Sequence, residues 1–184
     1  MVSTVVVSLA RYAFTPKPGP TPTPTAQPTS TPIAGYVAYT DDSNGFTISY
    51  PEDWDKIPDE SYIGGVVFGC RDNSSCEDHF PNFSVGKREL SQAMSVQTIF
   101  EEEKANLATL EGYTPISEED MFLDGMPAIK HVFTLVVDEA TVKVMEVLLV
   151  KGATLWFMPS ECVPGCWGYS KDYFDIIAGS FDLH

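Results

Sequence analysis

Basic residues are scarce in this sequence: its 184 residues include 11 Lys and Arg against 26 Asp and Glu, which leaves a formal charge of −15. A chain this acidic repels phosphate backbones, which excludes nucleic acid as an expected partner. No apolar run approaches the ~20 residues of a membrane-spanning helix. Hydrophobic residues nevertheless make up 43% of the chain, which excludes disorder throughout and suits one folded domain, two at most.

Motifs of catalysis are also missing. The sequence has no Gly-rich phosphate loop, no Gly-x-Ser-x-Gly elbow and no His-Glu-x-x-His pair. Its three histidines include no pair at metal-ligand spacing, and His131 lies on the apolar face of a predicted strand, where a structural role is favoured. The acidic clusters at residues 101–103 and 118–120 are expected to be solvated, with weak Ca²⁺ sites as the alternative. We therefore expect no enzyme activity, no metal and no cofactor.

Charge and composition divide the chain into three parts. Residues 1–14 are mostly apolar, and we interpret them as the remnant of a signal or anchor segment. Residues 15–35 form a Thr/Pro-rich linker with seven prolines, which favour an extended spacer. Residues 36–184 hold all 26 acids and form the predicted globular domain. This layout is typical of exported proteins, so an extracytoplasmic location is expected; a disordered cytosolic tail is the alternative.

Four cysteines occur as two close pairs, Cys70 with Cys76 and Cys162 with Cys166. An even number in a chain with the layout of an exported protein indicates two disulfides. Local pairing is favoured because each pair closes a short loop, and Pro164-Gly165 is a turn signal. Crossed disulfides, a zinc site and free thiols remain open alternatives, although the five residues between Cys70 and Cys76 exceed the usual zinc spacing.

Hydrophobic patterning in the globular part predicts an α+β fold. Strands are predicted at residues 36–40, 46–50, 65–69, 83–90, 129–137, 141–150 and 153–158. Asn44-Gly45 between the first two is a strong hairpin signal, and the run at 141–150 is apolar enough to be a central strand. Strands joined by turns, without βαβ alternation, indicate an antiparallel sheet flanked by helices.

Two helices are predicted. Ser95 is the expected N-cap of a helix that continues to about Leu110. Its apolar stripe consists of Val96, Ile99, Phe100, Leu107 and Leu110. Ser170 is the expected N-cap of the last helix, and Gly179 its C′ residue. The side chains expected to point inward from that helix are Tyr173, Phe174, Ile176 and Ile177.

Three segments resemble the PsbP-like domain family. Residues 44–54 (NGFTISYPEDW) resemble its opening gFsi.yP..W, residues 124–128 (DGMPA) its dG.pa entry to the central strands, and residues 174–181 (FDIIAGSF) its closing f..iv.SF. The resemblance implies an α-β-α sandwich around an antiparallel sheet. Members include the lumenal PsbP subunit of photosystem II, a Ran-binding nuclear transport factor and exported bacterial lipoproteins. They are mostly non-catalytic, and no catalytic motif carries over. The cysteine loops lie outside this pattern, and the Thr/Pro linker favours the exported prokaryotic branch.

Aromatic side chains give the one hint of a binding site. Trp167 and Tyr169 follow Cys166 closely, in a predicted loop pinned by the second disulfide. Rigid aromatic anchors bind at low entropic cost, so these two residues are the candidate partner-binding site. We expect a monomeric, non-enzymatic binding module whose partner is an unknown protein or cell-surface component. The alternative is a ligand carrier or enzyme with a pocket between sheet and helix, which a carboxylate of raised pKa would favour.

Overall fold

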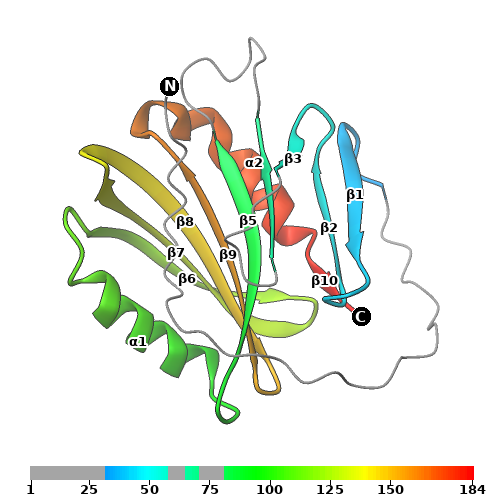
Figure 1. Ribbon diagram of the computed structural model, residues 1–184, viewed down its shortest axis with the longest axis horizontal. Coiled ribbons are helices and arrows are strands. Elements are labelled where there is room, and N and C mark those ends of the chain that lie inside the picture. The colour runs from blue at the N-terminus through cyan, green and yellow to red at the C-terminus, as the bar shows by residue number, and fades with distance from the viewer. Residues whose placement is uncertain (1–31, 58–64, 71–80) are drawn as a thin grey trace.

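The computed structural model describes residues 32–57, 65–70 and 81–184. Within these residues, ten strands form two antiparallel sheets (Figure 1). The small sheet has the order β1-β2-β10, and the large sheet has the order β3-β4-β5-β9-β8-β7-β6. The small sheet consists of β1 (Tyr36–Asp41), β2 (Phe46–Pro51) and β10 (Asp182–Leu183). The large sheet consists of β3 (Asp55–Ile57), β4 (Val66–Gly69), β5 (Asn82–Glu89), β6 (Thr114–Leu123), β7 (Met126–Val137), β8 (Ala140–Lys151) and β9 (Thr154–Cys162).

The first hairpin forms where the sequence predicts it. Gly45 has φ of 75°, a backbone conformation that a residue without Cβ adopts at little cost. Asp41 accepts hydrogen bonds from the backbone N–H and the side-chain amide of Asn44, at 3.0 and 2.8 Å. The register from Tyr36 opposite Pro51 to Asp41 opposite Phe46 follows from this turn.

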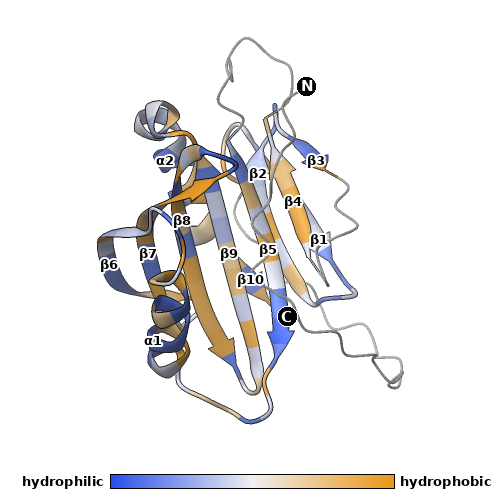
Figure 2. Ribbon diagram, turned by 60° about the vertical axis from the view of Figure 1, so that its left-hand side comes forward, coloured by the Kyte–Doolittle hydropathy of each residue, from blue (hydrophilic) through white to orange (hydrophobic). Residues whose placement is uncertain are grey.

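The large sheet confirms the central strand and adds two strands that the sequence did not predict. β8 is buried from Val144 to Leu149, and it is hydrophobic along most of its length (Figure 2). The unpredicted strands, β3 and β6, are the outermost in the order. Both are mostly polar and exposed, so they lack the hydrophobic alternation that identifies a half-buried strand. Pairing with β4 and β7 makes them strands.

Each face of the large sheet is covered by a different helix. Helix α1 (Val96–Leu107) packs against β7 and β8. Its buried side chains meet one set of sheet residues, including Ile129, Leu148 and Leu155. Helix α2 (Trp167–Gly179) and the small sheet cover the other face, where the largest core cluster includes Phe46, Val147 and Phe174. An antiparallel sheet between helical layers is the predicted α+β architecture (Figure 1).

Helix α1 follows its predicted start but ends early. The Ser95 hydroxyl accepts a hydrogen bond from the Thr98 N–H at 3.1 Å, which confirms the N-cap. The helix ends at Leu107 with Ala108 as C-cap, so Leu110 lies beyond it and is exposed. Including Leu110 in the buried stripe was therefore wrong.

Helix α2 differs from its prediction at both ends. It begins at Trp167 and not after Ser170, because the 3₁₀ turn at Pro164–Cys166 leads directly into it. Ser170 lies inside the helix, buried, with its hydroxyl 3.5 Å from the Cys166 sulfur. Gly179 is the last helical residue and not a C′ glycine, since Ser180 caps the helix with φ of −89°. The Ser180 hydroxyl then bonds the Ile177 carbonyl at 2.7 Å.

Among the described residues, no helix is long and apolar enough to cross a membrane. The predicted signal remnant and most of the predicted linker lie outside the described residues, so those two divisions of the chain stay predictions. Gly35, at the predicted linker end, already accepts a backbone hydrogen bond from Glu52 at 3.0 Å.

Candidate functional site

The second cysteine pair lies where β9 leads into α2. Cys162 is the last residue of β9, and Cys166 directly precedes α2. The two form a disulfide, as predicted, and both are buried. Cys70 is buried and disulfide-bonded as well. Its predicted partner, Cys76, lies outside the described residues, so that pairing stays a prediction.

Trp167 does not lie in a loop, contrary to its prediction: it is the first residue of α2. Its ring is partly buried against the core, 5.9 Å from the ring of Phe174. The ammonium group of Lys143 covers the indole at 4.6 Å from the ring centre, a favourable cation–π contact. Trp167 therefore anchors the start of α2 more than it offers a free aromatic surface.

Tyr169, the second predicted binding residue, is 48% exposed on α2. Tyr173 and Ile176 are 42% and 39% exposed, so predicting these two to point inward was wrong. Phe174 and Ile177 are buried, as predicted. Positions i, i+4 and i+7 of a helix share one face, so the three exposed side chains form a continuous apolar stripe. We call Tyr169, Tyr173 and Ile176 the α2 stripe.

The α2 stripe continues toward the small sheet. The buried ring of Trp54 lies 6.2 Å from that of Tyr173. Burial raises the pKa of the nearby Tyr36 hydroxyl, and the adjacent Tyr173, Asp172 and Asp53 raise it further. That hydroxyl oxygen is buried, and within the described structure it has no hydrogen-bond partner. Acidic groups therefore border an aromatic surface here.

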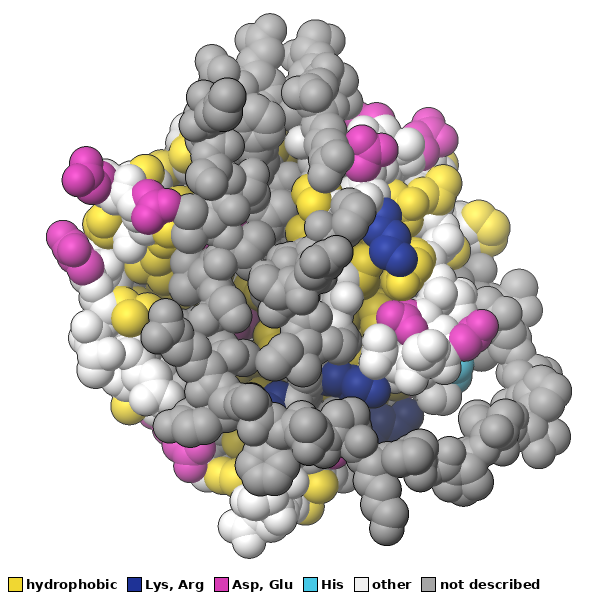
Figure 3. Space-filling model, in the orientation of Figure 1, with side chains coloured by type: hydrophobic (Ala, Val, Ile, Leu, Met, Phe, Trp, Pro, Cys, Tyr) yellow, Lys and Arg dark blue, Asp and Glu magenta, His cyan; other side chains and the backbone are white. Residues whose placement is uncertain are grey.

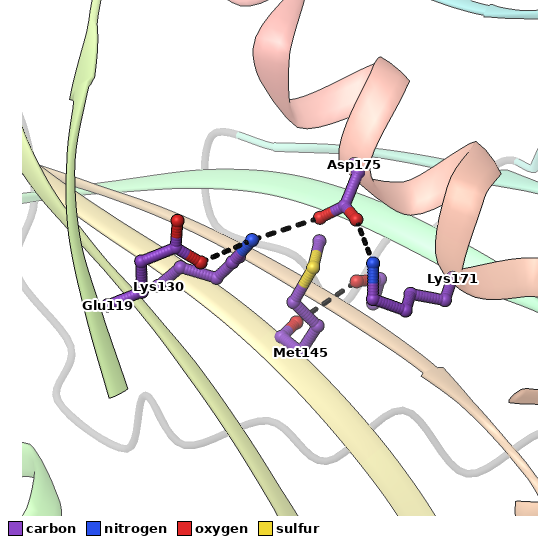
Figure 4. A network of polar contacts seen from close by, with 6 residues as sticks. Glu119, Lys130, Met145, Lys171 and Asp175 are labelled. Carbon is purple, nitrogen blue, oxygen red and sulfur yellow. Dashed lines mark hydrogen bonds and ion pairs between the residues drawn. The ribbon is translucent and has the colours of Figure 1, made fainter. Parts of the chain in front are cut away.

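The opposite flank of α2 is fixed to the sheet by ion pairs (Figure 4). Lys130 on β7 lies 2.8 Å from Glu119 on β6 and 3.3 Å from Asp175 on α2. Asp175 also pairs with Lys171 one turn earlier. Burial alone would lower the pKa of Lys130, but the hydrogen bonds and charges of Glu119 and Asp175 raise it. Because these pairs are partly exposed, each contributes little stability; they mainly orient the helix.

A buried polar row lies on the α1 side of the sheet. Glu146 on β8 stands directly opposite His131 on β7, and both are buried. The ring of His131 packs edge-on against Phe100 of α1 at 5.3 Å, and its Nε2 lies 3.4 Å from the Tyr113 hydroxyl. Burial lowers the pKa of His131, which fits the structural role that its strand position predicts.

Glu146 is the residue that sequence reasoning missed. Only 7% of it is exposed. Burial raises its pKa to about 7; the charge of Glu103 adds to the rise and that of Arg88 opposes it. Burial also raises the pKa of Glu161, although a 3.2 Å hydrogen bond from the Asn82 amide opposes this. The available signal was a single acid inside a mostly apolar strand.

The acidic clusters are ion-paired in part. Glu103 bonds Arg88 at 2.9 Å, and Glu118 pairs with Lys104. In residues 32–57, 65–70 and 81–184, no group of three or more His, Cys, Asp or Glu side chains could hold a metal ion. On the face drawn in Figure 3, acidic side chains lie at several places around the rim and basic ones in fewer places.

Comparison with known proteins gives the fold its name. No protein-family model matches the sequence, and no curated protein matches it. Among solved structures, cyanobacterial PsbP (CyanoP) from Synechocystis sp. PCC 6803 matches with a TM-score of 0.60 at 18% identity, over 86% of this chain and 98% of that one. The chain has the PsbP-like fold.

Two further structures share the PsbP-like fold at similar distance. LpqN of Mycobacterium tuberculosis, described as involved in cell envelope biogenesis, has a TM-score of 0.60 at 11% identity, over 80% of this chain and 90% of that one. A Pseudomonas aeruginosa protein of unknown function has a TM-score of 0.52 at 12% identity, over 76% of this chain and 90% of that one. At these identities the likeness shows the fold alone.

The segments that carry the resemblance occupy structural positions of the PsbP-like fold. Residues 44–54 form the first turn, β2 and the buried Trp54. Residues 124–128 turn from β6 into β7, with φ of 47° at Asp124 and 72° at Gly125. Residues 174–181 end α2 and place Phe181 in the core. These residues build the fold, whereas Tyr169, Tyr173 and Glu146 lie outside the three segments.

Proposed function

We propose that this PsbP-like domain is an extracytoplasmic, non-enzymatic binding module that docks a partner protein on the α2 stripe. The observation that carries the proposal is the exposure of Tyr169, Tyr173 and Ile176 on one helix face. Tyrosines that keep a polar hydroxyl while presenting a large apolar ring are typical of protein interfaces.

The acidic residues around the α2 stripe indicate which partner surface would fit it. Asp172 lies on α2 beside the stripe, and Asp53 lies in the turn after β2; the charges of both act on the nearby Tyr36 hydroxyl. The globular part has nine Lys and Arg against 26 Asp and Glu. An apolar partner surface rimmed by Lys or Arg would complement this face and would be steered toward it electrostatically.

Two observations support an extracytoplasmic location. A buried disulfide, Cys162 with Cys166, is typical of proteins that fold in oxidising compartments. LpqN, which shares the fold, is described as involved in cell envelope biogenesis. Together with the Thr/Pro-rich segment ahead of the domain, these favour a role at the envelope or beyond it.

Site-specific photocrosslinking tests the docking surface. A photoreactive phenylalanine replaces Ile176 in the full chain, expressed in the source cells. A matched control carries the same group at Leu110, which is 37% exposed, close to the 39% of Ile176, but follows α1. We expect one discrete adduct from position 176, none from 110, and loss of the adduct when Tyr169→Ala is added. Equal labelling from both positions, or none from 176, would contradict the proposal.

One observation favours the alternative of a ligand carrier or enzyme. The raised pKa of Glu146 leaves a partly protonated carboxyl on the sheet beneath α1, as a site between sheet and helix would need. Glu146→Gln distinguishes the two functions. If the partner adduct at position 176 persists in this variant, Glu146 is not needed for docking; if it disappears in a stably folded protein, the α1 side takes part in function.

A further inference from the structure

Strand β6 forms one outer edge of the large sheet. It follows β7 at the end of the strand order, and among the described residues it pairs with β7 alone. Figure 2 shows it at the outer side of the sheet, beyond β7. A strand in this position directs every second backbone N–H and C=O away from the sheet, where another strand can pair with them.

The two ends of β6 differ in how well they could accept a strand. Pro115 lacks an N–H, and the register with β7 shifts between Pro115 and Ser117; both features discourage further pairing. From Ser117 to Leu123 the register is regular, with Ser117 opposite Val132 and Leu123 opposite Met126. Seven regular residues suffice for a strand of ordinary length, about five to six residues.

Side chains along this regular segment are acidic on both faces. Side chains alternate between the two faces of a strand. Glu118 and Asp120 therefore lie on the face of the large sheet on which α1 packs, and Glu119 lies on the face on which α2 packs. Lys104 forms an ion pair with Glu118, and Lys130 forms one with Glu119. Asp120 is exposed, and no ion pair to it occurs in the described structure. Two positions beyond Asp120, Phe122 is 74% exposed on the same face.

These charges disfavour a second copy of this chain as the occupant. Antiparallel pairing of two β6 strands about Glu119 would place Glu118 opposite Asp120 twice and Glu119 opposite itself. Like charges directly opposite one another destabilise a strand pair, whereas opposite charges stabilise it. Pairing of two β6 strands is therefore unfavourable, and a strand with basic side chains is the favoured partner.

We propose that the β6 edge from Ser117 to Leu123 binds an extended basic segment of a partner protein by β-strand addition. Backbone hydrogen bonds along the edge supply affinity, as in other strand-addition complexes. Lys or Arg at consecutive positions of the segment face Glu118, Glu119 and Asp120, and an apolar side chain covers Phe122. This site is separate from the α2 stripe and stands whether or not a partner docks there.

Synthetic peptides test this directly on the full, isotope-labelled chain. The probe TVTKKKT places lysines opposite residues 118–120 and valine opposite Phe122 in antiparallel register. TVTKPKT keeps most of the charge but has a proline that removes a backbone donor, and TVTEEET reverses the charge. We expect TVTKKKT to shift the NMR signals of Ser117–Leu123 amides and slow their hydrogen exchange, more weakly at high salt. The other two peptides should do neither.

Two matched charge reversals then distinguish strand pairing at β6 from a general attraction of the basic peptide to an acidic protein. Asp120→Lys should weaken TVTKKKT binding by roughly fivefold, the size of one cross-strand charge pair. Glu102→Lys makes the same change in net charge on the exposed side of α1 and should leave binding within about twofold, since distant surface charges are screened by salt. Phe122→Ala should weaken binding without altering the exchange pattern.

Several results would overturn the proposal. These are an absence of shifts at β6 with millimolar TVTKKKT, equal binding of the proline peptide, or equal loss from Asp120→Lys and Glu102→Lys. Dimerisation of the chain through β6 would also overturn it, because the edge would then accept its own sequence. Loss of the photocrosslink at position 176 bears only on the α2 stripe, so the two proposals fail separately.

Discussion

At the scale of single residues, Glu146 carries the largest electrostatic consequence. Its carboxyl is buried on β8, with the charges of Glu103 and Arg88 acting on it from α1 and β5. An ionised carboxyl is costly to bury without a close partner, which is why its pKa rises from 4.5 to about 7. The native state therefore holds a proton that the unfolded chain releases.

The first prediction concerns the pH dependence of stability. Between the pKa of about 4.5 in the unfolded chain and about 7 in the native state, the native state binds more protons at Glu146. Stability should therefore fall as pH rises through this window and level off above it. The upper bound for this one group is about 3 kcal/mol. Glu146→Gln should remove this fall, which urea unfolding at pH 5, 6.5 and 8 would measure.

His131 and a surface variant serve as checks on this prediction. Burial lowers the pKa of His131, so this residue changes the stability in the opposite direction. Its contribution to stability is lost as pH falls below the ordinary pKa of histidine. The comparison is therefore made between Glu146→Gln and the unchanged protein in the same buffers. Glu102→Gln, on the exposed side of α1, should leave the profile unchanged; an unchanged profile in Glu146→Gln as well would show that its carboxyl is solvated.

At the scale of secondary-structure elements, the junction of β9 and α2 determines how the α2 stripe is presented. The disulfide closes the turn that precedes the helix, and Trp167 packs on Phe174 immediately after it. The helix then has one flank fixed to the sheet by Lys130 and Asp175. The exposed side chains are thus displayed on an element held at its start and along one side.

The second prediction is that opening this disulfide loosens the start of α2 more than it destabilises the domain. Cys162 and Cys166 close a loop far shorter than ~15 residues, for which the entropic contribution would be about 3 kcal/mol. A Cys162→Ser, Cys166→Ser variant should therefore unfold only slightly more easily. The emission of Trp167 should become more quenchable by acrylamide, measured with Trp54 and Trp156 each replaced by Phe. A large loss of stability with unchanged quenching would contradict this.

Sequence patterns succeeded for strongly hydrophobic strands and for one helix cap, and failed at the sheet edges and at the other helix ends. β2 and β8 carry unambiguous hydrophobic patterns, and Ser95 is a cap whose hydrogen bond is local. β6 is polar and exposed, so only its pairing with β7 identifies it. The predicted start of α2 is wrong because Ser170 lies inside the helix, and the turn closed by the disulfide leads directly into its first residue, Trp167.

At the scale of the whole molecule, the small sheet, α2 and one face of the large sheet share the largest hydrophobic cluster, while α1 packs on the other face. Phe46 of β2, Trp156 of β9 and Phe181 after α2 make mutual ring contacts at 5.5–5.6 Å. Segments from the beginning, middle and end of the domain thus meet in one place. Cooperative unfolding of the described residues as a single unit follows from this arrangement.

The third prediction concerns the segment ahead of the domain. Removing residues 1–31 should shift the melting temperature by no more than about 2–3 °C, because Thr/Pro spacers bury little apolar surface. Ile33 and Gly35 are kept, since their carbonyls accept backbone hydrogen bonds from Tyr36 and Glu52. Differential scanning calorimetry of the two proteins measures the shift. A drop of more than about 5 °C would mean that the segment packs on the domain, since one kcal/mol corresponds to a few degrees at this size.

The sequence alone determined the acidic charge and predicted the α+β class, the PsbP-like resemblance and the central strand, because each depends on composition or on residues close together in the chain. It favoured the pairing of Cys162 with Cys166, which the structure then decided. Only the tertiary structure decided which apolar residues of α2 face solvent, that β6 is an edge and that Glu146 is buried. Burial and edge position depend on which elements pack together across long sequence separations. A local pattern marks a residue as apolar or acidic; its partners in space decide whether it stabilises the core, binds another molecule or holds a proton.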